Sequence, residues 1–122
     1  MATLSIRIDV GPGNRIGPGK VQLLEMIAEH GSISAAARAL GMSYRRAWLL
    51  IEAMNRGFGR PVVEAQIGGK AGGGARLSSF GADLIAHYRA IERAADKAAA
   101  PFLDRIAAPA QGKDDAPPTA IS

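Results

Sequence analysis

The stretch that decides the fold is GSISAAARALGMSYRRAW, residues 31–48. Gly31 is typical of a helix end, and the serines that follow it are typical caps for a short helix, which we expect over Ala35–Leu40. Gly41 ends that helix, and Ser43 is a natural cap for another, longer helix. The three consecutive alanines are small enough to let two helices cross closely. The pattern therefore predicts a helix-turn-helix.

Two elements are expected before this stretch. Apolar residues recur at helical spacing across Lys20–His30, which predicts a first helix. Its expected buried side consists of Val21, Leu24, Ile27 and Ala28. Apolar and polar residues alternate across Leu4–Val10, a period of two that predicts a half-buried strand, and Gly11–Asn14 then forms a turn.

The third helix is expected to run from its cap at Ser43 to about Arg56. A helical wheel separates an apolar side from a basic one. The apolar side consists of Ala47, Leu50, Ile51, Met54 and Phe58, and the other side of Arg45, Arg46, Leu49, Glu52, Ala53 and Arg56. The apolar side is expected to face the core.

Beyond the third helix, Val62–Gln66 and Ala75–Leu77 have the pattern of short strands. Residues 68–74 between them contain five glycines, which favours a β-hairpin with a glycine-rich tip. Ser78 or Ser79 then caps a long last helix.

Pro101 is expected to kink or divide this last helix. The order strand, helix, helix, helix, hairpin, helix is that of a winged helix-turn-helix, mainly α with a small β-hairpin wing. We expect one such domain over residues 1–107, and a disordered Ala/Pro-rich tail over residues 108–122.

Charge and composition narrow the class of protein. The formal net charge of the 122 residues is +4, but between Gly31 and Ser78 seven basic residues stand against two acidic ones, a local surplus of five. Such a concentration indicates a polyanionic partner, here double-stranded DNA. The chain has no cysteine, which excludes disulfides and zinc–cysteine sites. Without a signal peptide or a long apolar run, we expect a cytoplasmic protein with no membrane partner.

The N-terminal part of the third helix is the segment expected to read DNA in the major groove. Arg45 and Arg46 can pair with guanine edges or bind phosphate, and Leu49 can touch thymine methyl groups or pack in a dimer. A solvated arginine face is the alternative interpretation. The predicted DNA-binding residues are Ser32, Ser34, Ser43, Tyr44, Arg45, Arg46, Leu49, Arg56, Gly69, Lys70, Gly72, Gly73 and Arg76.

The hairpin tip belongs to the candidate set, and two aromatic residues of the third helix need separate interpretation. Five glycines exceed what a turn needs and let the tip lie against a phosphate backbone or enter the minor groove, although a plain flexible turn is the alternative. Lys70 and Arg76 add charge there. We interpret Trp48 as a core anchor rather than a base-stacking residue, while Tyr44 is left between packing and phosphate contact.

The sequence does not match the motifs tested for phosphate-binding loops or metal sites. A phosphate-binding loop around Gly69 and Lys70 would need glycine at Glu64 and Ser or Thr at Ala71. His30 and His87 lie in separate predicted helices and are interpreted as helix-end or surface residues. We therefore expect no enzyme, no catalytic residues, no metal site and no cofactor.

Several segments together resemble the N-terminal domain of molybdate-responsive (ModE-type) transcriptional regulators. They are GSISAAA at 31–37, GMSYRRAW at 41–48, Met54-Asn55, GGKAGGGA at 68–75 and LSSFG at 77–81. The combination of SYRRAW with a GGKxGGG wing carries the resemblance, which runs from about Ile16 to Ile106. Its helix-turn-helix is also similar to the LysR type.

The resemblance implies a bacterial homodimer that binds a palindromic operator. It also implies that the first strand and a long dimerisation helix over Phe80–Ala100 build the dimer. No segment resembles the family's oxyanion-binding domains, so direct control by molybdate is not expected, and whether a separate sensor protein supplies it is left open. An alternative function is a protein-interaction module on a winged-helix fold with only non-specific DNA binding, an idea that the apolar Leu49 and the missing sensor motivate.

Overall fold

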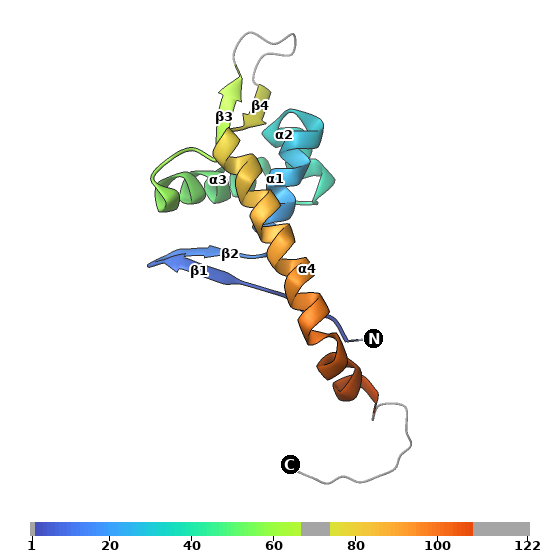
Figure 1. Ribbon diagram of the computed structural model, residues 1–122. Helices are drawn as coiled ribbons and strands as arrows, with labels where there is room; N and C mark the ends of the chain where they lie inside the picture. The colour runs from blue at the N-terminus through green and yellow to red at the C-terminus, as the bar shows by residue number, and fades with distance from the viewer. Residues whose placement is uncertain (1, 67–73, 109–122) are drawn as a thin grey trace.

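The computed structural model describes residues 2–66 and 74–108 (Figure 1). The elements are β1 (Ile8–Gly11), β2 (Asn14–Ile16), α1 (Pro18–His30), α2 (Ile33–Ala39), α3 (Tyr44–Phe58), β3 (Val63–Gln66), β4 (Gly74–Leu77) and α4 (Ser79–Ala107). Helices α1 to α3 form a small unit with the β3–β4 hairpin at one end, and α4 crosses this unit and continues well past it. The predicted winged helix-turn-helix with a long last helix is confirmed.

The helix-turn-helix is built by the glycines and serines that the sequence pointed to. Gly31 and Gly41 end α1 and α2 with φ angles of +74° and +69°, a left-handed conformation that favours glycine. Ser32 Oγ accepts a hydrogen bond from the Ala35 amide at 3.0 Å, and Ser43 Oγ accepts one from the Arg46 amide at 3.0 Å. With Ser32 as the cap, α2 begins at Ile33, two residues earlier than expected.

The core lies between α1, α2, α3 and the start of α4. Ala36 and Ala37 are buried, as close helix crossing requires. Along α1, Val21, Leu24 and Ile27 are buried as predicted. The prediction for Ala28 was wrong, because Ala28 is exposed and Leu23 is fully buried instead. Because α1 packs against α2, β4 and α4 together, its buried arc is rotated toward Leu23.

The N-terminal strand is shorter than predicted and pairs with a second strand that was not predicted. β1 begins only at Ile8 and pairs antiparallel with β2, which begins at Asn14 within the predicted turn. The preceding residues pass alongside α4, where the Tyr88 hydroxyl donates a hydrogen bond to the Ile6 carbonyl at 2.7 Å. Because the backbone before Ile8 turns toward α4, alternation of side chains alone overestimated the length of the strand.

The wing is a two-stranded antiparallel hairpin in which Val63 pairs with Leu77 and Gln66 with Gly74. Two hydrogen bonds fix it to the helices. Asn55 Oδ1 of α3 accepts from the Val62 amide at 2.8 Å, and the Gly31 carbonyl accepts from the Ala75 amide at 2.9 Å. The wing is therefore held at a defined angle to α3.

Helix α4 starts at a tight corner and runs unbroken past Pro101. Ser78 Oγ caps the helix by accepting from the Gly81 amide at 2.9 Å and donates to the Pro61 carbonyl at 2.6 Å. The expectation that Pro101 divides the helix was wrong, since α4 continues to Ala107. The missing amide of a proline removes a single helical hydrogen bond, and Pro101 lies exposed on α4.

A bidentate ion pair ties α4 to α1. Arg89 Nε and Nη2 donate to the two carboxylate oxygens of Glu25 at 2.9 and 2.7 Å, and Arg89 Nη1 donates to Glu92 Oε1 at 2.6 Å. The hydrogen bonds from Arg89 lower the pKa of Glu25 below its ordinary value of 4.5, although burial opposes this shift. The folded protein therefore holds the proton of Glu25 less tightly than the unfolded chain does.

Glu25→Gln is expected to lower the free energy of unfolding by about 1 kcal/mol at neutral pH, because a third of each side chain is still exposed to solvent. The stabilisation is complete above pH 4.5 and is lost as the pH falls through the lowered pKa. Urea unfolding of both proteins at pH 7 and pH 3 measures this, and the difference should shrink at pH 3. An equal difference at both pH values would contradict the account.

Candidate nucleic-acid interface

Helix α3 presents one buried and one exposed side, as the wheel predicted. Ala47, Ile51 and Met54 are buried, and Leu50 and Phe58 are partly buried against the core. The exposed residues of the N-terminal half are Tyr44, Arg45, Arg46, Trp48 and Leu49. The side of α3 that faces solvent therefore carries two arginines, two aromatic residues and an apolar side chain in two turns.

The arginines of this face differ in their pairing. Arg56 lies 3.6 Å from Glu52, and Arg76 of β4 lies 3.9 Å from Glu64. In the part of the chain that the structure describes, no ion pair includes Arg45 or Arg46. The positive charge is thus uncompensated at the N-terminal end of α3, where a recognition helix contacts base edges.

The three predicted serines lie at the N-terminal ends of α2 and α3. The Ser32 and Ser43 hydroxyl oxygens already accept the capping hydrogen bonds, which leaves each hydroxyl proton free to donate to an acceptor outside the protein. Ser34 is exposed in the first turn of α2. Their arrangement suits phosphate oxygens, which only accept hydrogen bonds.

Of the predicted wing residues, Arg76 is exposed on β4 and belongs to the described part of the chain. Gly69, Lys70, Gly72 and Gly73 lie outside the described residues. Because Gly31 of the helix-turn-helix is hydrogen-bonded to the wing, the hairpin and the N-terminus of α2 lie on the same flank of α3.

Trp48 is not the core anchor that we predicted. Its side chain is 42% exposed and lines a groove of about 280 Å³ between α3 and the wing, together with Tyr44, which is 54% exposed. The core near α3 is already filled by Ala47 and Ile51, which leaves Trp48 on the edge of the exposed face. Tyr44 is exposed and lines this groove, and its predicted phosphate contact stays a prediction.

Three cations outside the predicted DNA-binding set lie beside the exposed face of α3. Arg7, Arg15 and Lys20 line a second groove together with Arg46, on the flank of α3 away from the wing groove. No local pattern marks them, because they come from separate elements near the N-terminus that only the fold brings next to α3.

Metal-binding clusters and membrane-spanning helices are both missing from the described residues. Among residues 2–66 and 74–108, no group of three His, Cys, Asp or Glu side chains is arranged to hold a metal ion. His30 is the last residue of α1 and His87 is exposed on α4. None of the helices in these ranges has the length and apolar character needed to cross a bilayer.

Comparison with known families decides the class of this helix-turn-helix. Residues 19–82 match the model of the bacterial regulatory helix-turn-helix protein, lysR family, which covers the first helix, the helix-turn-helix, the wing and the start of α4. The chain belongs to the LysR family of bacterial regulatory helix-turn-helix proteins. The match includes both arginines and the capping serines described above.

Individual relatives confirm the ModE-type resemblance. The chain is 40% identical to the molybdenum-pterin-binding protein MopA of Rhodobacter capsulatus over 109 residues, which cover 89% of this chain and 40% of that protein. It is 51% identical to MopB of the same organism over 90 residues, 74% of this chain and 33% of MopB. It is 42% identical to the DNA-binding transcriptional dual regulator ModE of Escherichia coli K12 over 81 residues, 66% of this chain and 31% of ModE. The chain thus spans about a third to two fifths of these relatives.

Solved structures support the fold of this LysR-family chain. A crystal structure of the CbnR_DBD-DNA complex superposes with a TM-score of 0.53 and 22% sequence identity, covering 74% of this chain and 95% of that one. Full-length CbnR complexed with its target DNA gives the same TM-score at 20% identity, covering 70% of this chain and 28% of CbnR. At such identities the likeness shows the winged-helix fold alone.

Proposed function

We propose that this protein is a sequence-specific, double-stranded DNA-binding transcriptional regulator that places α3 in the major groove. The observation that carries the proposal is the pair of arginines, Arg45 and Arg46, that stand without carboxylate partners at the exposed start of a helix flanked by a wing. Membership of the LysR family and the similarity to ModE proteins support the same function.

The exposed residues divide into those that read bases and those that bind phosphate. Arg45 points from the middle of the exposed side of α3 and suits the O6 and N7 acceptors of guanine. Leu49, one turn further on, suits a thymine methyl group. Ser32, Ser34, Ser43 and Tyr44 are assigned to phosphate oxygens near the two helix N-termini, and Arg56 to the backbone at the far end of α3.

The wing contacts the neighbouring part of the duplex in this proposal. Arg76 of β4 approaches the phosphate backbone, and Gly69, Lys70, Gly72 and Gly73 are assigned to the backbone or minor groove. A solvated arginine face would not need a wing fixed by hydrogen bonds beside it, as Asn55 and Gly31 fix this one.

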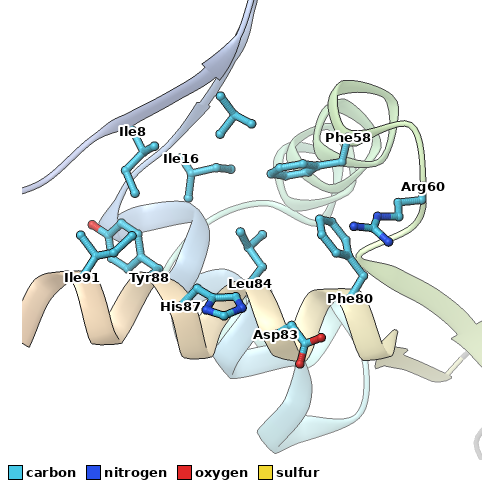
Figure 2. A pocket seen from close by; sticks show the side chains of 11 residues that line it. Ile8, Ile16, Phe58, Arg60, Phe80, Asp83, Leu84, His87, Tyr88 and Ile91 are labelled. Atoms are coloured by element: carbon cyan, nitrogen blue, oxygen red, sulfur yellow. The ribbon is translucent and has the colours of Figure 1, made fainter.

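A homodimer with a palindromic operator is supported by the apolar side of α4. A pocket of about 410 Å³ between the β1–β2 hairpin and α4 is lined mainly by apolar side chains, among them Ile8, Phe58, Leu84 and Ile91 (Figure 2). Phe102 and Ile106 continue the same stripe of α4 and are 67% and 70% exposed. We assign a second copy of this chain to this stripe, which extends the predicted dimer helix over Phe80–Ala100 by Phe102 and Ile106 and would place two half-sites in one operator.

The names of the relatives suggest which genes are regulated. Two ModE relatives are named molybdenum transport proteins. We therefore propose that this protein acts in the bacterial cytoplasm and controls genes for molybdenum handling. The family match makes the alternative of an interaction module without operator specificity the less favoured function.

Arg45→Ala and Arg46→Ala test the assigned face. Each substitution is expected to weaken binding to a selected operator by about 1–3 kcal/mol, roughly 5- to 150-fold, because a bidentate base contact or a phosphate contact is lost. Fluorescence anisotropy with a labelled operator measures the effect. Arg93→Ala, at an exposed position of α4, serves as the control. Wild-type affinity in both variants would exclude this face of α3 as the DNA-reading surface.

A further inference from the structure

A basic groove lies against α3 on the flank away from the wing groove. It measures about 270 Å³ and is lined by cations from three elements and the segment before β1, with no acidic lining residue. These cations are Arg7, Arg15, Lys20 and Arg46. We infer that this basic groove binds phosphodiester groups of the DNA strand opposite the one that the wing contacts. The inference rests on the proposed function and extends its contact surface to the N-terminal segment of the chain.

The cations of the basic groove are held in place but mostly lack carboxylate partners. Lys20 Nζ donates to the Arg15 carbonyl at 2.7 Å, which fixes the ammonium group at the rim. The stem of Arg7 packs over Gly17, where an added Cβ would lie 3.0 Å from Arg7 Cγ. Arg15 pairs with Asp9 at 2.7 Å. Within the described ranges no ion pair includes Arg7, Lys20 or Arg46, so three positive charges converge with none compensated.

The basic groove is continuous with the exposed face of α3. Arg46 and Leu50 line it and also line the adjoining hollow formed by Ser43, Arg45 and Leu49. On the other flank of α3, Tyr44 and Trp48 border the wing. The exposed face of α3 is therefore flanked by the wing on one side and by the basic groove on the other.

The dimensions of DNA place phosphates on both of these flanks. The major groove is about 12 Å wide and a helix with its side chains is about 10–12 Å across, so a helix that enters it comes close to both phosphate backbones. The wing and the N-terminus of α2 serve one backbone. The other backbone passes the side of α3 on which Arg46 lies. Its phosphates can bind there to the three uncompensated cations.

The salt dependence of binding tests the basic groove separately from sequence reading. Each phosphate contact contributes about 0.9 to the slope of log K against log salt, so Arg7→Ala/Lys20→Ala should reduce the slope by about 2. The double variant should lose the same factor in affinity for the operator and for unrelated duplex DNA. Arg93→Ala/Lys97→Ala removes the same charge from exposed positions of α4 that do not line the basic groove, and it should leave the slope unchanged. Circular dichroism confirms that both variants are folded.

Any of four results would overturn the inference. An unchanged slope in Arg7→Ala/Lys20→Ala, or an equal reduction in the control, shows that the basic groove does not bind DNA phosphate. A loss confined to the operator shows base reading instead. If inorganic phosphate raises the melting temperature of the wild type but not of the double variant, and the DNA slope is unchanged, the basic groove holds a free anion. A wild-type protein without sequence preference would defeat the proposed function alone, because the slope can still be compared.

Discussion

Gly81→Ala is expected to lower the free energy of unfolding by about 3 kcal/mol, the largest stability effect that we predict for a single added methyl group. A Cβ at this position would lie 2.2 Å from the carbonyl oxygen of Val62 and 3.0 Å from its carbonyl carbon. Both are backbone atoms, so no side chain can rotate away. The first turn of α4 would have to move off the strand connection, and the hydrogen bond from the Ser78 amide to the same carbonyl, at 3.0 Å, would be lost.

Thermal unfolding followed by circular dichroism measures this effect, and the melting temperature should fall by on the order of 10 °C. Gly19→Ala is the matched control, because Gly19 is also helical, is exposed and has open space where a Cβ would be. Alanine is the better helix former, so this control should be neutral or stabilising by up to about 1 kcal/mol. Equal melting temperatures for Gly81→Ala and the wild type would refute the close approach of α4 to Val62.

The second large effect is expected at the far end of α4. Phe102→Asp/Ile106→Asp should convert the dimer to a monomer and weaken binding to a palindromic operator by on the order of 100-fold, because the two half-sites no longer act together. Both side chains are mainly exposed within one chain, so their replacement leaves the fold of the monomer intact. In a dimer, two aspartates per chain would bring carboxylates into an apolar contact.

Sedimentation equilibrium gives the oligomeric state, and anisotropy on full and half operators gives the affinities. Arg93→Asp is the matched control, because it changes the net charge by the same two units on the opposite side of α4. It should remain dimeric. A dimeric Phe102→Asp/Ile106→Asp variant would place the dimer contact elsewhere, and a monomeric wild type would remove the dimer from the account.

The sequence predicted the helix-turn-helix well because its signals are local. Left-handed backbone conformations and capping hydrogen bonds act within one or two helical turns. They occur at Gly31, Ser32, Gly41 and Ser43. The exposed arginines of α3 follow from helical periodicity. These features need no knowledge of what packs against them.

The errors concern residues whose environment is set by distant segments. Trp48 was expected in the core because a large aromatic side chain usually is buried, but Ala47 and Ile51 already fill that side of α3. Leu23 is buried and Ala28 is exposed, the reverse of the prediction, because α1 packs against neighbours on several sides. The basic groove could not be foreseen, since Arg7 and Lys20 meet α3 only through the fold.

The central claim, sequence-specific DNA binding, is tested most directly by selecting genomic DNA fragments on the purified protein at about 50 and 200 mM salt, a range over which non-specific binding falls steeply. We expect one palindromic site to be enriched at both concentrations, with the preference reduced by Arg45→Ala. Enrichment that follows no sequence and disappears at the higher salt concentration would contradict the account and favour a protein-interaction role for this winged helix.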